Sequence, residues 1–79
     1  MPTLASIMRR QPVSSSALRS VGYERQSQTL EVEFASGEVY RYLGVELIVH
    51  KALLRADSMG RFVNERIKPR YPSVHVDDA

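Results

Sequence analysis

The sequence contains neither cysteine nor tryptophan, and it is short. The lack of cysteine excludes disulfide bonds and thiolate metal sites, on which small secreted proteins usually depend. We therefore expect a reducing compartment and a cytoplasmic protein. At 79 residues the chain has room for one domain. Its core is thin, because a chain of this size buries only about 60 % of its unfolded surface.

Long hydrophobic runs are also missing. No stretch approaches the roughly 18 apolar residues of a membrane span. The charges of Arg9 and Arg10 follow a very short apolar stretch, whereas a signal peptide has the reverse order and a longer apolar core. We expect no membrane partner. A hydrophobic fraction of 43% and a charged fraction of 25% are ordinary for a globular chain, which argues against disorder of the whole protein.

A catalytic constellation is absent as well. His50 and His75 stand alone and far apart, so we expect no metal. Glu31 and Glu33 alternate with apolar residues, which places them on the outward face of a strand, where nothing prepares them for acid–base work. No nucleophile has a base beside it. The sequence therefore predicts a non-catalytic binding module, with no cofactor and no evident small-molecule substrate.

The clearest structural signal is a pair of extended runs around Gly37. Residues 29–34 alternate apolar side chains with glutamates, and residues 38–43 return after a short break, which predicts a β-hairpin. A two-residue loop would put Arg41 on the core face. A three-residue loop with Gly37 in the left-handed conformation satisfies both faces, so we prefer it. It gives the pairs Leu30–Tyr42, Val32–Tyr40 and Glu31–Arg41.

The segments before and after the hairpin also have patterns that predict secondary structure. Leu18, Val21 and Tyr23 indicate an earlier strand, with a bulge at or near Gly22. Helical spacing indicates a helix over residues 45–56 and a second over about 59–68, capped by Asp57 or Ser58, with a tight approach to a neighbouring backbone at Gly60. In the first helix one stripe should meet the sheet: Val45, Ile48, Val49, Ala52, Leu53 and Ala56. Leu47 and Leu54 lie on the opposite side with His50, and need the second helix or another subunit to cover them.

We therefore predict an α+β fold: a three-stranded antiparallel β-meander followed by two short helices packed on one face. Residues 1–12 are expected to be a flexible N-terminal arm. The domain itself should span residues 13–71. Residues 72–79 are expected to be a flexible tail.

Charge is unevenly distributed, although the net charge is only +2. Residues 41–70 hold seven basic and three acidic side chains, while residues 21–40 hold one Arg and four Glu. The basic residues are candidates for a phosphate-binding face, or else form an ordinary solvated helix surface: Arg41, Lys51, Arg55, Arg61, Arg66, Lys68 and Arg70. Tyr40 and Tyr42 either form a stacking platform for unpaired bases or pack against the core, and the preferred register favours the core.

The order and spacing of several short motifs resemble the KTSC family. The motifs are Val21-Gly22-Tyr23, the alternating run to Phe34, Tyr40-Arg41-Tyr42 followed by Gly44-Val45, and Gly60-Arg61-Phe62-Val63-Asn64. Members are small domains named for the C-terminal extension of some lysyl-tRNA synthetases, and they also occur as stand-alone bacterial proteins. The chain departs from the family at Glu46, where proline is common, and at His50, where tyrosine is common. The resemblance covers about residues 13–71.

Two functions follow as hypotheses. The attachment of such domains to a tRNA synthetase suggests RNA binding, here through the basic helical residues. The alternative is a protein-interaction or self-associating module, a homodimer for example, that uses the Leu47/Leu54 stripe.

Overall fold

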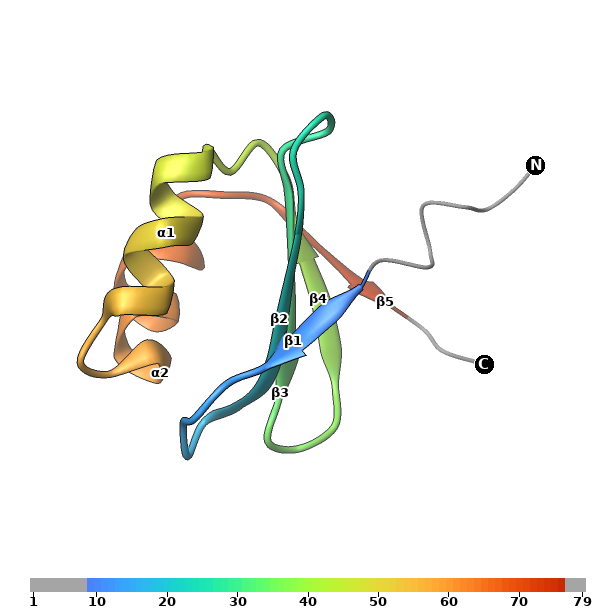
Figure 1. Cartoon of the computed structure of the whole chain (residues 1–79). Coiled ribbons are helices and arrows are strands. Elements are labelled where there is room, and N and C mark those ends of the chain that lie inside the picture. Colours follow the sequence, from blue (N-terminus) through green and yellow to red (C-terminus); the bar gives the residue numbers. More distant parts are fainter. Residues whose placement is uncertain (1–8, 77–79) are drawn as a thin grey trace.

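A computed structural model describes residues 9–76 and shows one antiparallel sheet with the helices on one of its faces (Figure 1). The strands run in sequence order across the sheet, and each is antiparallel to the next. The elements are β1 (Arg10–Pro12), β2 (Leu18–Glu24), β3 (Thr29–Phe34), β4 (Val39–Tyr42), α1 (Leu47–Arg55), α2 (Met59–Phe62), the π-helical turn η2 (Val63–Ile67) and β5 (Ser73–Val76).

The central hairpin has the register that the sequence predicts. Val32 lies opposite Tyr40, and Glu31 lies opposite Arg41. Gly37 adopts a φ of +97°, and the Phe34 N–H donates to the Glu38 carbonyl at 2.9 Å to close the three-residue loop. The hairpin prediction is therefore confirmed, because only this register keeps the arginine off the core face.

The prediction of three strands is wrong, because the sheet has five. Residues 10–12 pair with β2 rather than forming a loose arm, and residues 73–76 pair with β4 rather than forming a loose tail. Both strands are short: β1 has three residues without alternation, and the alternation of β5 covers only four residues, which is too few for periodicity to indicate a strand. Residues 1–8 and 77–79, the rest of the expected arm and tail, lie outside the described residues.

The position of β5 follows from how the chain leaves and returns to the sheet. The whole helical segment is inserted between β4 and β5, which are neighbours in the sheet. The Leu43 N–H donates to the Pro72 carbonyl at 2.9 Å, so the two ends of the insertion are held together. The helices therefore cover the face of the sheet while the chain returns to the edge of β4.

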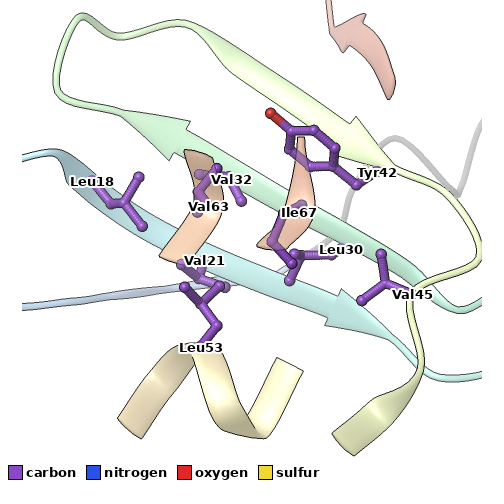
Figure 2. Close-up of a cluster of buried hydrophobic side chains, with 9 residues drawn as sticks. All are labelled: Leu18, Val21, Leu30, Val32, Tyr42, Val45, Leu53, Val63 and Ile67. Atoms are coloured by element: carbon purple, nitrogen blue, oxygen red, sulfur yellow. The ribbon is translucent and has the colours of Figure 1, made fainter. Parts of the chain in front are cut away.

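The core lies between the sheet and the helical segment (Figure 2). Strand residues from β2, β3 and β4 meet residues that follow β4, including Leu53 of α1 and two residues of η2. Each of the nine is at most 3% exposed: Leu18, Val21, Leu30, Val32, Tyr42, Val45, Leu53, Val63 and Ile67. Because Val63 and Ile67 are both fully buried, η2 contributes more to the core than its length suggests.

Helix α1 is rotated relative to the predicted stripes. Leu53 is fully buried and Val49 packs against the core, as expected, but Ile48 is 72% exposed and Ala52 is exposed. The helix has only nine residues and one buried position, so the thin core accepts a narrower stripe than the sequence offers. The prediction that Ile48 and Ala52 face the sheet is wrong.

The second helix begins as predicted. The Ser58 hydroxyl accepts a hydrogen bond from the Arg61 N–H at 3.2 Å, which caps α2. A Cβ on Gly60 would lie 2.7 Å from the Cβ of Ala17, so the approach is tight, but the neighbour is a side-chain carbon and not the backbone that we expected. This contact holds the start of α2 against the segment that leads into β2.

The outer face of the sheet, which the helices leave uncovered, carries a buried carboxylate. Glu31 is 2% exposed and accepts hydrogen bonds from two arginines, Arg41 at 2.6 Å (Nε to Oε1) and Arg10 of β1. Glu31 points outward from the strand and pairs with Arg41, as expected, but it is buried. Arg10 reaches Glu31 across β2 because the β2 residue that pairs with both of them is Gly22, which has no side chain. A Cβ on Gly22 would lie 2.7 Å from the Arg9 carbonyl oxygen.

A second polar row extends this network. Arg10 Nε donates to the Ser20 hydroxyl at 3.0 Å, and Ser20 donates to Glu33 at 2.8 Å. The register irregularity in β2 falls between Leu18 and Ser20, so the bulge predicted near Gly22 is misplaced. Gly22 instead provides the space through which β1 approaches the sheet.

Replacement of Glu31 should show that this network stabilises the fold. In Glu31→Gln, Arg10 and Arg41 lose their shared carboxylate, so we expect the free energy of unfolding to fall by about 2–4 kcal/mol. Glu33→Gln is the matched control, since Glu33 is on the same strand and face but its side chain is 23% exposed. It should cost less than about 1 kcal/mol. If urea denaturation shows that the two variants lose the same free energy of unfolding, this role for Glu31 is contradicted.

Candidate nucleic-acid interface

Six of the seven predicted basic residues lie in or next to the helices. All six are exposed: Lys51, Arg55, Arg61, Arg66, Lys68 and Arg70. We call them the basic helical surface. Within residues 9–76 the ion pairs involve Arg10, Arg19 and Arg41, and none involves these six. Arg66 lies with its guanidinium carbon 5.9 Å from the centroid of the Phe62 ring, and both line a shallow depression with Arg61.

Arg41, the seventh predicted residue, does not belong to this surface. It lies on the outer face of β4, where it binds Glu31, and its side chain is only 19% exposed. Its placement follows from the hairpin register, which points residue 41 away from the helices. The predicted nucleic-acid-binding residue Arg41 thus lies on the face of the sheet away from the helices, bound to Glu31.

The two tyrosines of the motif have different environments. Tyr42 is 2% exposed and belongs to the core, and burial raises the pKa of its hydroxyl above the ordinary value. Tyr40 is half-buried. Its ring packs edge-on against Phe34, with centroids 5.9 Å apart, and at a tilt against His75 of β5, with centroids 4.8 Å apart. The core prediction holds for Tyr42, while Tyr40 lies at the rim of the core.

Tyr40 borders a groove of about 550 Å³, which we call the aromatic groove. Its lining comes from the β3–β4 hairpin, the segment before β2, the end of η2 and the start of β5: Ala17, Phe34, Ala35, Ser36, Glu38, Tyr40, Tyr42, Lys68 and Ser73. Lys68 Nζ lies 5.3 Å from the centroid of the Phe34 ring, a cation–π distance. Lys68 therefore belongs both to the basic helical surface and to the aromatic groove.

Leu47 and Leu54 border a second groove, between α1 and the β1–β2 edge, together with Tyr23 and His50. Leu47 is half-buried and Leu54 is 39% exposed. The ring of His50 stacks on Tyr23 at 4.7 Å, and the Tyr23 hydroxyl donates to the Val45 carbonyl at 2.5 Å. The leucine stripe is thus shielded in part by the sheet edge and is not covered by the second helix.

Sequence reasoning missed the aromatic groove. It placed His75 in a tail and treated Phe34 as an ordinary core residue, so it had no reason to join either to Lys68. The signal available in the sequence is the position of Phe34, which is the last apolar residue of the alternating run and lies beside the turn. Its proximity to Lys68 depends on the path of the helices, which the local sequence does not encode.

Comparison with known proteins identifies the fold and the part of the chain that forms the family domain. A model of the KTSC domain matches residues 14–71. The chain belongs to the KTSC family. A KTSC domain protein of Yersinia pestis of known crystal structure superposes with a TM-score of 0.84 at 38% identity, covering 89% of this chain and 99% of that chain.

Other relatives in the family are stand-alone proteins or part of a larger enzyme. An uncharacterised protein of Stutzerimonas stutzeri is 52% identical over 64 residues, which is 81% of this chain and 90% of that protein. The lysine–tRNA ligase of Nostoc punctiforme is 39% identical over 56 residues, which is 71% of this chain but only 10% of the ligase. The KTSC region is therefore shared by small proteins and by a segment of a tRNA ligase.

Residues 9–76 also lack two features that would indicate other classes of function. No helix among them has the length and apolar character to cross a bilayer. No three metal-capable side chains among them come together as a ligand set. The non-catalytic role and the cytoplasmic location stay predictions.

The stacked histidine should make stability depend on pH. Burial, and to a lesser degree Lys51, lowers the pKa of His50 below its ordinary value, so the unfolded chain takes up this proton at a higher pH than the folded chain. The stability that comes from keeping His50 neutral in the folded chain is present above about pH 6.5, the ordinary histidine pKa, and it is lost as the pH falls below that value. His50→Phe keeps an aromatic ring without a titrating group. Urea denaturation at neutral and mildly acidic pH should show wild type losing more stability than His50→Phe, and identical losses would contradict the assignment.

Proposed function

We propose that this KTSC protein is an RNA-binding module that contacts the phosphate backbone through the basic helical surface. The observation that carries the proposal is the separation of charge. The outer-face carboxylates of β3 are engaged by Arg10, Arg41 and Ser20, whereas the six helical cations are exposed and make none of the ion pairs in residues 9–76. Exposed cations without carboxylate partners are available to displace counterions from phosphates.

The acids of the helical layer do not cancel this surface. Residues 45–72 hold six basic and three acidic side chains, and Asp57 and Glu65 border the same depression as Arg61 and Arg66 without lying within ion-pair distance of them. The local field therefore stays positive, which favours an anionic polymer as the partner. The occurrence of the domain within a lysine–tRNA ligase, an enzyme whose substrate is a tRNA, supports RNA as that polymer.

Charge reversal provides the test. Wild type should bind a short fluorescein-labelled RNA with micromolar affinity that falls steeply between about 50 and about 200 mM salt, because each phosphate contact releases counterions. The double variant Arg66→Glu, Lys68→Glu should bind at least about ten-fold more weakly and show a shallower salt slope. Fluorescence anisotropy measures both quantities.

A matched control separates local contacts from net charge. Arg9→Glu, Arg25→Glu makes the same change in net charge at two exposed arginines beside the second groove. We expect it to weaken binding much less than the helical double variant does. An RNA affinity that is insensitive to salt, or equal losses in the two double variants, would rule out the basic helical surface as the contact region.

A second function, self-association or binding of another protein, is favoured by a different observation. Helix α1 exposes two large aliphatic side chains in different directions, Ile48 at 72% and Leu54 at 39%, and Leu54 lies with Leu47 at the second groove. An exposed apolar strip on a helix is a common element of interfaces between proteins. In this function a second copy of the chain, or a partner protein, covers Leu47 and Leu54.

Sedimentation velocity tests this alternative. If the Leu47/Leu54 stripe is an interface, wild type should sediment as a dimer at high concentration, and Leu54→Glu should sediment as a monomer because the charge would be buried in the contact. Leu43→Glu is the matched control, since Leu43 has the same exposed fraction of 39% but lies before α1. A wild type that stays monomeric at every concentration would remove the support for self-association.

A further inference from the structure

We infer that the aromatic groove holds an unpaired nucleobase of single-stranded RNA while Lys68 contacts the adjoining phosphate. This inference rests on the proposed function and goes beyond it, because the basic helical surface by itself gives no reason to prefer a single strand over a duplex. The groove commits the protein to one kind of occupant through its shape, its aromatic lining and its charge.

The lining of the groove provides stacking surface. Tyr40 and Phe34 are both half-buried, and each ring packs against the core and also borders the groove. The edge-on packing of the two rings, with an interplanar angle of 74°, presents two differently oriented aromatic walls. Bases stack on such side chains with little regard to sequence, because every base has a π-face.

A second ring also restrains the position of Tyr40. His75 of β5 is the cross-strand partner of Tyr40, and the two ring centroids are 4.8 Å apart. A ring that packs against both Phe34 and His75 loses little freedom when a base stacks on it. Preorganisation of this kind lowers the entropic cost of binding.

Charge orients the occupant. Lys68 lies over Phe34 at one side of the groove, and the carboxylate-bearing Glu38 lines it as well. Glu38 repels a phosphate, and Lys68, which continues into the basic helical surface, attracts one. A nucleotide therefore enters with its phosphate toward Lys68 and its base toward Tyr40, and the rest of the strand can follow the basic helical surface.

Size and base pairing limit what enters. The groove volume of about 550 Å³ lies within the range of pockets that hold small ligands, which suits one nucleotide. A base within a duplex is stacked and paired, so it cannot reach the groove without being unpaired first. The groove should therefore make the protein prefer single-stranded RNA, whereas contacts to phosphates alone would favour the denser charge of a duplex.

Three RNA probes test the inference with the wild-type protein. They are a fluorescein-labelled single strand of about eight nucleotides, the same strand annealed to its complement, and an abasic strand of the same length that keeps the phosphates. We expect the intact single strand to bind about ten-fold more tightly than the abasic strand, the equivalent of stacking one base at about 1.4 kcal/mol. The duplex should also bind more weakly than the intact strand.

A variant then locates the effect. Tyr40→Leu keeps apolar bulk at the rim of the core but removes the π-face, and it should lower affinity for the intact strand about ten-fold while leaving affinity for the abasic strand unchanged. Tyr71→Leu is the matched control, because Tyr71 also packs against the core at half-buried exposure but does not line the groove. It should leave both affinities unchanged.

The outcomes separate this inference from the proposed function. Equal, salt-dependent binding of the intact and abasic strands would overturn the base-binding role of the groove and leave backbone binding by the helical cations in place. Equal losses from Tyr40→Leu and Tyr71→Leu would also overturn it. Absence of binding to all three probes at low salt would reject the proposed function itself, and the inference with it.

Discussion

The return of the chain beside β4 is the constraint on which the arrangement of this domain depends. The hydrogen bond from Leu43 to Pro72 joins the start and the end of the helical insertion. Because those ends are fixed together, the helices must cross one face of the sheet and come back, and residues 73–76 must continue as β5 at its edge. The same path carries Lys68 over Phe34 and brings His75 against Tyr40.

A second constraint keeps the two faces of the sheet chemically distinct. On the outer face, the buried Glu31 binds one arginine from β1 and one from β4, which ties strands from both sides of β3 to the centre of the sheet. This is possible because Gly22 has no side chain to obstruct β1. Breaking such a pair is costly in a low-dielectric site. Arg10 and Arg41 are thereby engaged within the sheet, whereas the cations of the helical layer stay exposed.

The sequence was most informative where the signal is local. The alternation in residues 29–34, with Arg41 excluded from the core, determined the central register, and Ser58 marked the start of the second helix. The sequence did not predict the environment of a residue where that environment depends on segments far away along the chain. The strand β1 has no alternation, Ile48 looked like a core residue although the core has no room for it, and the burial of Glu31 depends on an arginine 21 positions away.

The same distinction between local and distant signals decides which parts of the candidate site could be predicted from the sequence. The basic residues could be selected from charge density, and all but Arg41 are exposed on the helical layer. The aromatic groove could not, because its walls come from a hairpin, the end of a helix and an edge strand that periodicity did not detect. Tyr40 illustrates why the choice between core and ligand was too coarse. A tyrosine at the rim of a thin core can support the core with one side of its ring and border a groove with the other, so its packing and a role in binding do not exclude each other.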